Sequence, residues 1–174
     1  MPSAPFETVI LTAALYGILL IFIGMFTIVY QWVLVDATRV RLGEMANQVA
    51  HEITCIYSMC QQSRNEQIQL FKPIEIPVST SGYGYAIELK KIGETWFVTT
   101  YLEANRAVNA SSPLWEDQSE AVKVETGSGD LSVNSYLIRY QAILHSGQAR
   151  PVVWAEKKPD GTIRVGVGWV SGGG

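Results

Sequence analysis

The chain has 174 residues, of which 48% are hydrophobic and 17% charged, and its formal net charge is −3. A chain of this length is expected to form one domain with an appendage. The longest basic runs are the pairs Lys90-Lys91 and Lys157-Lys158. This acidic balance, without a basic block, argues against a nucleic-acid-binding surface.

The first predicted element is an apolar segment at residues 8–35, which contains 28 residues without a charge. A secretory signal has an apolar region of roughly 7–15 residues, and a basic stretch precedes it. Here the first basic residue is Arg39. As a helix the segment would be about 42 Å long, whereas a bilayer core is about 30 Å thick. We therefore predict a retained membrane helix.

The sequence features that bear on the orientation of this helix point in different directions. Arg39 and Arg41 follow the segment, and the positive-inside rule taken alone would place the following domain in the cytoplasm. Two other features favour the outside: the surface-like composition of the β-rich region, and the sequon Asn109-Ala110-Ser111, which makes Asn109 a candidate glycosylation site. We expect the domain outside.

The second predicted element is an amphipathic stretch at residues 36–62 that continues the apolar segment. Apolar residues recur every three or four positions, which is the period of a helix with one buried face. With no Pro between Pro5 and Pro73, the sequence predicts a single helix over about residues 6–62. The residues expected to face the sheet are Leu42, Met45, Val49, Ile53 and Ile56.

Residues 63–174 read as a β-rich domain of six to eight short strands, after a polar connector at 63–72. Strands are expected at 74–78, 85–89, 95–102, 121–125 and 136–144, with a loop at 104–119. Residues 152–156 and 162–170 are expected to form a hairpin across a Pro-Asp-Gly turn. The predicted fold is α+β, with the helical region 1–62 packed on an antiparallel β-sandwich or partial barrel at 63–174.

Candidate chemistry is sparse. His51, Cys55 and Cys60 resemble a metal-binding string, but Cys60 would point about 140° away from Cys55 on a helix, so we predict no metal site. A Cys55–Cys60 disulfide would require the helix to end or distort near Ser58, and burial of both thiols at the helix–sheet interface is the alternative. No nucleophile, carboxylate pair or phosphate loop is recognisable. We expect no enzyme and no cofactor.

Glu7 is the only charged residue before Asp36. It is either an interfacial residue that the helix N-terminus favours, or a carboxylate that pairs with a cation of a neighbouring copy. The sequence leaves both interpretations open.

The unbroken run ETVILTAALYGILLIFIGMFTIVYQWVLV, the following VRLGEMANQVAHEI and the β-rich stretch PVSTSGYGYAIELKKIGETWFVTTYL resemble the type IV pilin superfamily, and archaeal pilins and archaellins most closely. The resemblance covers the architecture of the whole chain. It implies a helix that sits in the membrane, is then extracted, and packs against identical helices in a filament core with the β-domain outside. The implied membrane and filament-core residues are Val9, Leu11, Ala14, Leu15, Gly17, Ile18, Ile21, Phe22, Gly24, Met25, Ile28, Val29 and Trp32.

The same resemblance implies partners and a location. The partners are copies of the chain itself, the membrane before assembly, assembly machinery and surface receptors, and the location is an extracellular filament. Gly17, Gly24 and Gly43 would allow close approach of helices, which favours polymerisation.

The chain also departs from the family pattern. It has neither a basic leader before the apolar run nor a proline kink in it. Either the sequence is that of the mature form or the chain is not processed in the usual way, and Met1 favours the second interpretation. Bacterial pilins carry a Glu near the position of Glu7, but its role is not carried over. One alternative is a single-pass membrane-anchored pilus or archaellum accessory or stator protein that does not polymerise. Another is a membrane-tethered enzyme or binding protein.

Overall fold

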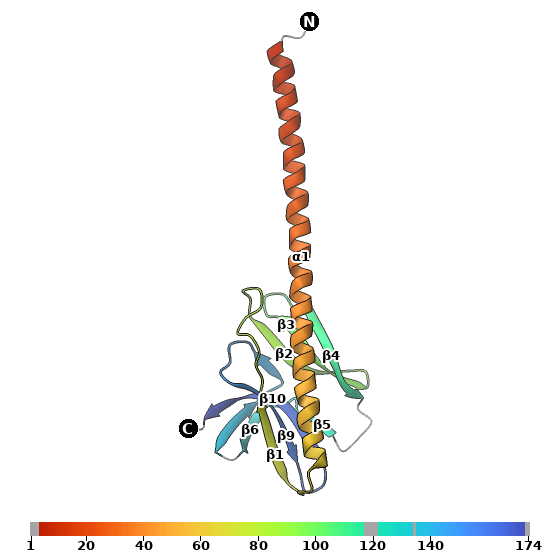
Figure 1. Cartoon of the computed structure of the whole chain (residues 1–174), viewed down its shortest axis with the longest axis vertical. Helices are drawn as coiled ribbons and strands as arrows, with labels where there is room; N and C mark the ends of the chain where they lie inside the picture. Colours follow the sequence, from red (N-terminus) through yellow and green to blue (C-terminus); the bar gives the residue numbers. More distant parts are fainter. Residues whose placement is uncertain (1–3, 117–121, 134, 173–174) are drawn as a thin grey trace. The chain divides into compact units, whose positions relative to one another are not determined.

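The protein combines one long helix with two β-sheets. The computed structural model describes residues 4–116, 122–133 and 135–172. Helix α1 (Ala4–Gln62) has 59 residues, in agreement with the single helix predicted over about 6–62. The chain divides into two compact units, Met1–Ala37 and Thr38–Gly174, so the lower part of α1 belongs to the same unit as the strands (Figure 1).

The larger sheet has the order β1-β9-β10-β7-β6, and β5 also pairs with β10. The pairs along this order are antiparallel, whereas β5 is parallel to β10. The strands are β1 (Ile68–Pro73), β5 (Val122–Val124), β6 (Gly129–Val133), β7 (Tyr136–Tyr140), β9 (Pro151–Lys157) and β10 (Ile163–Gly172).

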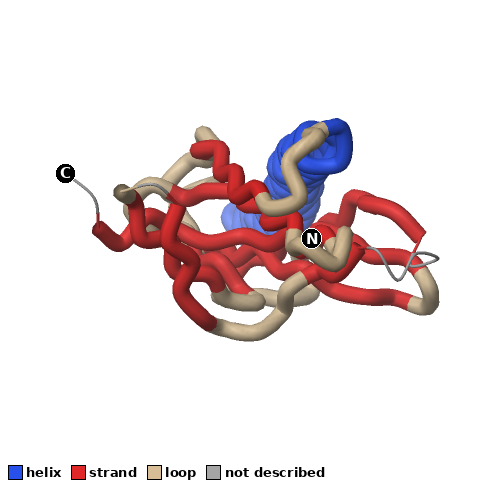
Figure 2. Tube along the Cα trace, turned by 90° about the horizontal axis from the view of Figure 1, so that it is seen from below, coloured by secondary structure: helices blue, strands red, loops and turns tan. Residues whose placement is uncertain are grey.

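The second sheet has the order β4-β3-β2-β8, and all its pairs are antiparallel. Its strands are β2 (Tyr85–Ile92), β3 (Thr95–Leu102), β4 (Asn109–Glu116) and β8 (Ile143–His145). Seen along the helix, the lower part of α1 lies on one side of the strands (Figure 2). The predicted α+β class, a helix on mainly antiparallel sheet, is confirmed.

The main core joins the lower part of α1 to both sheets. The five residues predicted to face the sheet are all at most 5% exposed: Leu42, Met45, Val49, Ile53 and Ile56. They share one hydrophobic cluster with Ile87 and Val98 of the smaller sheet and with Val153 and Val165 of the larger one. The apolar face that this helical period creates therefore packs against both sheets.

A second, smaller core lies on the other face of the larger sheet, because neighbouring residues of a strand point to opposite faces. It consists of Leu131, Val133, Ile138, Val152 and Trp154. The Trp154 ring is fully buried and lies 4.9 Å from the Tyr140 ring. A Cβ at Gly166 would fall 2.7 Å from this indole, so the site needs glycine.

Several predicted elements are corrected by the structure. Residues 74–78 are not a strand, and the preceding connector at 63–72 holds most of β1. The expected loop at 104–119 contains β4, and β6 lies where no strand was expected.

The long strand expected at 136–144 is also wrong. It breaks at residues 141–142 into β7 and β8, which pair in different sheets. The β9–β10 hairpin is confirmed: Val153 pairs with Val167, and Gly161 takes a φ of 83° in the turn. Of the strand predicted at 121–125, Ala121 lies outside the described residues, and β5 occupies 122–124.

Tyr85 is expected to lower the stability of the β-domain at alkaline pH. Its ring is fully buried, its hydroxyl donates a hydrogen bond to the Pro77 carbonyl, and burial raises its pKa to about 12. An unfolded tyrosine loses its proton near pH 10. The folded state therefore holds this proton up to a higher pH than the unfolded state does. The stability that Tyr85 contributes is lost as pH rises from about 10 to 12, and about 1.4 kcal/mol of it is lost by about pH 11.

We therefore expect Tyr85→Phe to shrink the loss of unfolding free energy between pH 8 and pH 11 by about 1 kcal/mol. The measurement is guanidinium unfolding of the full chain in detergent, followed by tryptophan fluorescence at both pH values. Tyr83→Phe, at an exposed tyrosine, is the control and should behave as the wild type. An unchanged alkaline loss in Tyr85→Phe would contradict the assignment.

Candidate functional site: an exposed apolar helix segment

The most unusual feature of the chain is the apolar segment, residues 8–35 of α1. By its length and composition, the helix that contains this segment is long and apolar enough to cross a membrane. Every residue of the segment is exposed, including the thirteen residues named above as the membrane and filament-core set. Soluble monomers rarely expose apolar patches beyond a few hundred Å². The segment is therefore suited to lipid or to other apolar helices.

Two threonine hydroxyls within the apolar segment are satisfied by the helix itself. The Thr12 hydroxyl donates to the Thr8 carbonyl at 2.7 Å, and the Thr27 hydroxyl donates to the Ile23 carbonyl at 2.9 Å. The helix pairs its own backbone groups, which is a requirement in hydrocarbon where water is absent. These two threonines can thus enter an apolar environment without losing hydrogen bonds.

Gly17 and Gly24 leave room on the surface of the apolar segment. They are seven residues apart and so lie near one face of the helix. A Cβ added at either position would meet nothing within 4 Å. At Gly43, by contrast, an added Cβ would lie 3.8 Å from the Ala110 side chain of β4. The upper glycines, which each cost a helix about 1 kcal/mol relative to alanine, are not required by packing inside this chain.

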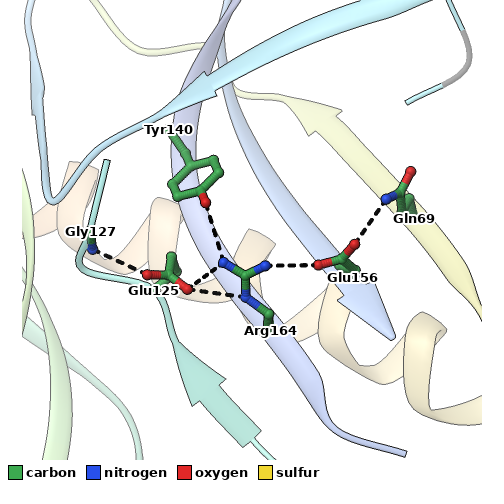
Figure 3. A network of polar contacts seen from close by, with 6 residues as sticks. All are labelled: Gln69, Glu125, Gly127, Tyr140, Glu156 and Arg164. Carbon is green, nitrogen blue, oxygen red and sulfur yellow. Dashed lines mark hydrogen bonds and ion pairs between the residues drawn. The ribbon is translucent and has the colours of Figure 1, made fainter. Parts of the chain in front are cut away.

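A second candidate is a charged cluster on the larger sheet, centred on Arg164 of β10 (Figure 3). Its guanidinium donates to Glu125 Oε2 from Nε at 3.0 Å, to Glu156 Oε2 at 3.0 Å and to the Tyr140 hydroxyl at 3.3 Å. Glu156 also accepts a hydrogen bond from Gln69 at 2.9 Å. The cluster therefore joins β1, β7, β9 and β10 to the segment that follows β5.

The charges of this cluster indicate a structural role, in which ion pairs hold the strands together. Burial opposes the charge of Arg164, but its hydrogen bonds to Glu125 and Tyr140 outweigh burial and raise its pKa above the usual value. Both carboxylates accept hydrogen bonds from this permanently charged guanidinium. The cluster has no local sequence pattern, because its members are far apart along the chain.

The cysteine region gives no metal centre or disulfide in the part of the chain that the structure describes. His51 Nε2 lies 3.5 Å from Cys55 Sγ, but Cys60 is fully buried among core residues. Among the described residues there is no group of three potential ligands that would hold a metal. Cys55 and Cys60 are free thiols. The disulfide alternative is wrong because α1 continues through both positions, where residues five apart are too distant to bridge.

The sequon residue Asn109 is exposed, although it lies at the start of β4 and not in the expected loop. Its side-chain amide donates to the Arg106 carbonyl at 2.8 Å. It lines a shallow polar groove of about 270 Å³ with Glu88, Tyr101 and Ser111. Its side chain can be reached from solvent, and glycosylation stays a prediction.

Comparisons with protein-family models, curated proteins and solved structures found no match for this chain. Its function is therefore argued from its own residues.

Sequence reasoning missed a contact between the β-domain and the lower part of α1. The turn at residues 80–83 contacts α1 at Thr38, through a hydrogen bond of 3.0 Å between the hydroxyls of Thr38 and Ser81. Nothing in the sequence indicated that this turn would contact the helix at Thr38.

Proposed function

We propose that this protein is a structural subunit of a type IV pilus-like filament at the cell surface. Its apolar segment lies in the membrane before assembly and afterwards packs against the same segment of neighbouring copies. The β-domain stays exposed. No enzymatic step is part of this proposal.

The observation that carries the proposal is the continuity of α1. Its apolar segment exposes every side chain, whereas a few residues later Leu42 and Met45 are buried in the β-domain core. One helix thus joins a surface that needs an apolar partner to a surface that already has one. Identical copies that associate head to tail without closing generate a helical filament.

The glycines support assembly over permanent anchoring. Lipid chains are fluid and adapt to any side chain, so a single helix in lipid gains nothing from Gly17 or Gly24. Helix–helix interfaces use such small residues because they let backbones approach closely. The space beside both glycines is open within this chain, so a second helix fits there.

The second candidate is an accessory protein that keeps the same helix as a permanent single-pass anchor. The observation favouring it is the length of the segment, since 28 charge-free residues are by themselves enough to span a bilayer. This candidate needs no partner helix.

The two candidates are separated by shearing cells gently, pelleting the released material and imaging it by electron microscopy. The intact mass and N-terminus of the protein in each fraction are then measured. The filament proposal expects abundant protein in thin filaments, with a mass that also reports processing and glycosylation of Asn109. Protein found solely in the membrane fraction would contradict it and would support the anchor.

A further inference from the structure

A small pocket lies between two loops of the β-domain, and both loops belong to the compact unit Thr38–Gly174. Its volume is about 300 Å³, which is at the lower end of the range for small-molecule sites. Its lining residues come from two segments, 76–78 and 145–151, and the second of these joins β8 to β9. The pocket therefore has room for a group of about the size of one amino-acid residue.

Both segments are held in place by hydrogen bonds to the domain. The hydroxyl of the fully buried Tyr85 donates to the Pro77 carbonyl, and the Tyr85 amide donates to the Ser146 hydroxyl at 3.0 Å. The Ile74 amide donates to the Pro151 carbonyl at 2.9 Å. Tyr85 thus fixes one segment through its side chain and the other through its backbone, so the pocket is formed without a ligand.

Arg150 lines the pocket in an unfavourable backbone conformation. Its φ is 53°, where a side chain with a Cβ is crowded, and a residue that precedes a proline is normally extended. Its carbonyl accepts a hydrogen bond from the Val170 amide at 3.1 Å, which holds this conformation. Strained residues cluster at ligand-binding sites, so Arg150 is the first residue of the pocket to consider as a ligand-binding group.

The polar groups that remain available in the pocket are donors. Within the part of the chain that the structure describes, the exposed Arg150 forms no ion pair. Gln148 Oε1 accepts a hydrogen bond from the His145 amide at 3.3 Å, so the Gln148 side chain presents its two amide hydrogens to a ligand.

No acidic residue is among the described residues that line the pocket. The nearby Glu103 does not line it, and its Oε1 lies 2.5 Å from His145 Nδ1, so this carboxylate is already paired. The rest of the lining includes the apolar side chains of Ile76, Val78 and Pro151. Donors beside apolar side chains complement an anionic acceptor that is attached to an apolar group.

We propose that this pocket binds the carboxylate of a short apolar acid, either the last residue of a peptide or a free N-acylated amino acid. The Arg150 guanidinium pairs with the carboxylate through two parallel N–H donors, and the Gln148 amide donates to the same group. The aliphatic part of the ligand lies against Ile76, Val78 and Pro151. This inference goes beyond the proposed function and does not depend on filament formation.

The test is a titration of the full chain in detergent with N-acetyl-leucine, followed by NMR of ¹³C-labelled histidine rings. The chain has two histidines. His145 lines the pocket, whereas His51 on α1 does not and serves as the internal control. N-acetyl-leucinamide is the matched ligand, because it keeps the apolar group and lacks the charge. Any effect of partitioning into the detergent would be at least as large for this uncharged amide.

Two variants test the assigned roles while keeping the loop intact. Arg150→Asn removes the guanidinium, and asparagine tolerates a positive φ. Arg64→Asn is its matched control, because it removes the charge of an exposed arginine that does not line the pocket. Gln148→Glu keeps the oxygen that accepts from the His145 amide and replaces the donor by a negative charge, so it should abolish binding of an anion.

The expected result is a saturable shift of the His145 ring signal with N-acetyl-leucine and none with the amide. The affinity should fall about tenfold or more in Arg150→Asn, because a charge-assisted hydrogen bond is lost, and should be unchanged in Arg64→Asn. A peptide that ends in leucine and binds more tightly than N-acetyl-leucine would assign the pocket to peptide C-termini, whereas equal affinity would assign it to the free acid.

Three results would overturn the proposal. The first is the absence of a saturable shift at His145, and the second is an equal response to the acid and the amide. The third is an affinity for N-acetyl-leucine that Arg150→Asn leaves unchanged. A parallel shift of the His51 signal would indicate a general effect of the added salt and would count against the pocket in the same way.

Discussion

Replacing Gly24 by leucine is expected to remove filaments from the sheared fraction while leaving the membrane-bound pool unchanged. The larger side chain fills the space that an approaching helix would need, because nothing within this chain lies within 4 Å of the position. In the monomer the change is favourable, since glycine costs a helix about 1 kcal/mol and leucine is more apolar. Loss of assembly would therefore not result from poor folding or poor insertion.

The readout for this substitution is the ratio of filament-associated to membrane-associated protein, measured by immunoblot after shearing. Ala14→Leu, on the same segment, is expected to act in the same direction. Ile23→Leu is the matched control, because it conserves volume at an exposed position and should keep the wild-type ratio. Normal filaments with both Gly24→Leu and Ala14→Leu would show that no close packing occurs there.

The helix was predictable because its signals are local. The apolar residues of 8–35 need no partner to be recognised, and below them Leu42, Val49 and Ile53 recur with the helical period. All three are fully buried in the structure. A pattern that repeats over many turns outweighs a single unfavourable residue such as Gly43.

The strand errors have a different cause, because pairing is decided by distant residues. Strand β4 reads as a loop since it contains Asn109 and Pro113, but β4 is an edge strand, where a proline is tolerated. The segment 136–144 has the alternation of one strand, yet β7 pairs with β10 and β8 pairs with β2. Local sequence does not encode the point at which a chain crosses from one sheet to another.

The candidate sites show the same contrast between local and long-range signals. The apolar segment was visible in the sequence, whereas the contact of Ser81 with Thr38 joins residues 43 positions apart. The Arg164 cluster was equally hidden, since its carboxylates at Glu125 and Glu156 come from separate segments. Contacts of this kind depend on the assembled sheet order, which no short motif predicts.

The largest loss of stability is expected from Ile53→Ala. Ile53 is fully buried where α1 meets the strands, and truncating such a residue costs about 2–5 kcal/mol because a cavity remains. Whole domains are stable by only about 5–15 kcal/mol. Met59→Ala is the matched control on the same helix, since Met59 is 62% exposed and its truncation should cost less than about 0.5 kcal/mol.

The measurement is guanidinium unfolding of both variants and the wild type in detergent, combined with protease digestion of the vesicle-inserted protein. Ile53→Ala should lower the unfolding midpoint strongly and expose the β-domain to protease, while a protected fragment containing the apolar segment persists, because insertion depends on residues 8–35 alone. It should also reduce filament yield, since subunits with an unfolded β-domain cannot pack regularly. If Ile53→Ala proved as stable as Met59→Ala, the lower helix would not be the core element that joins the apolar segment to the sheets.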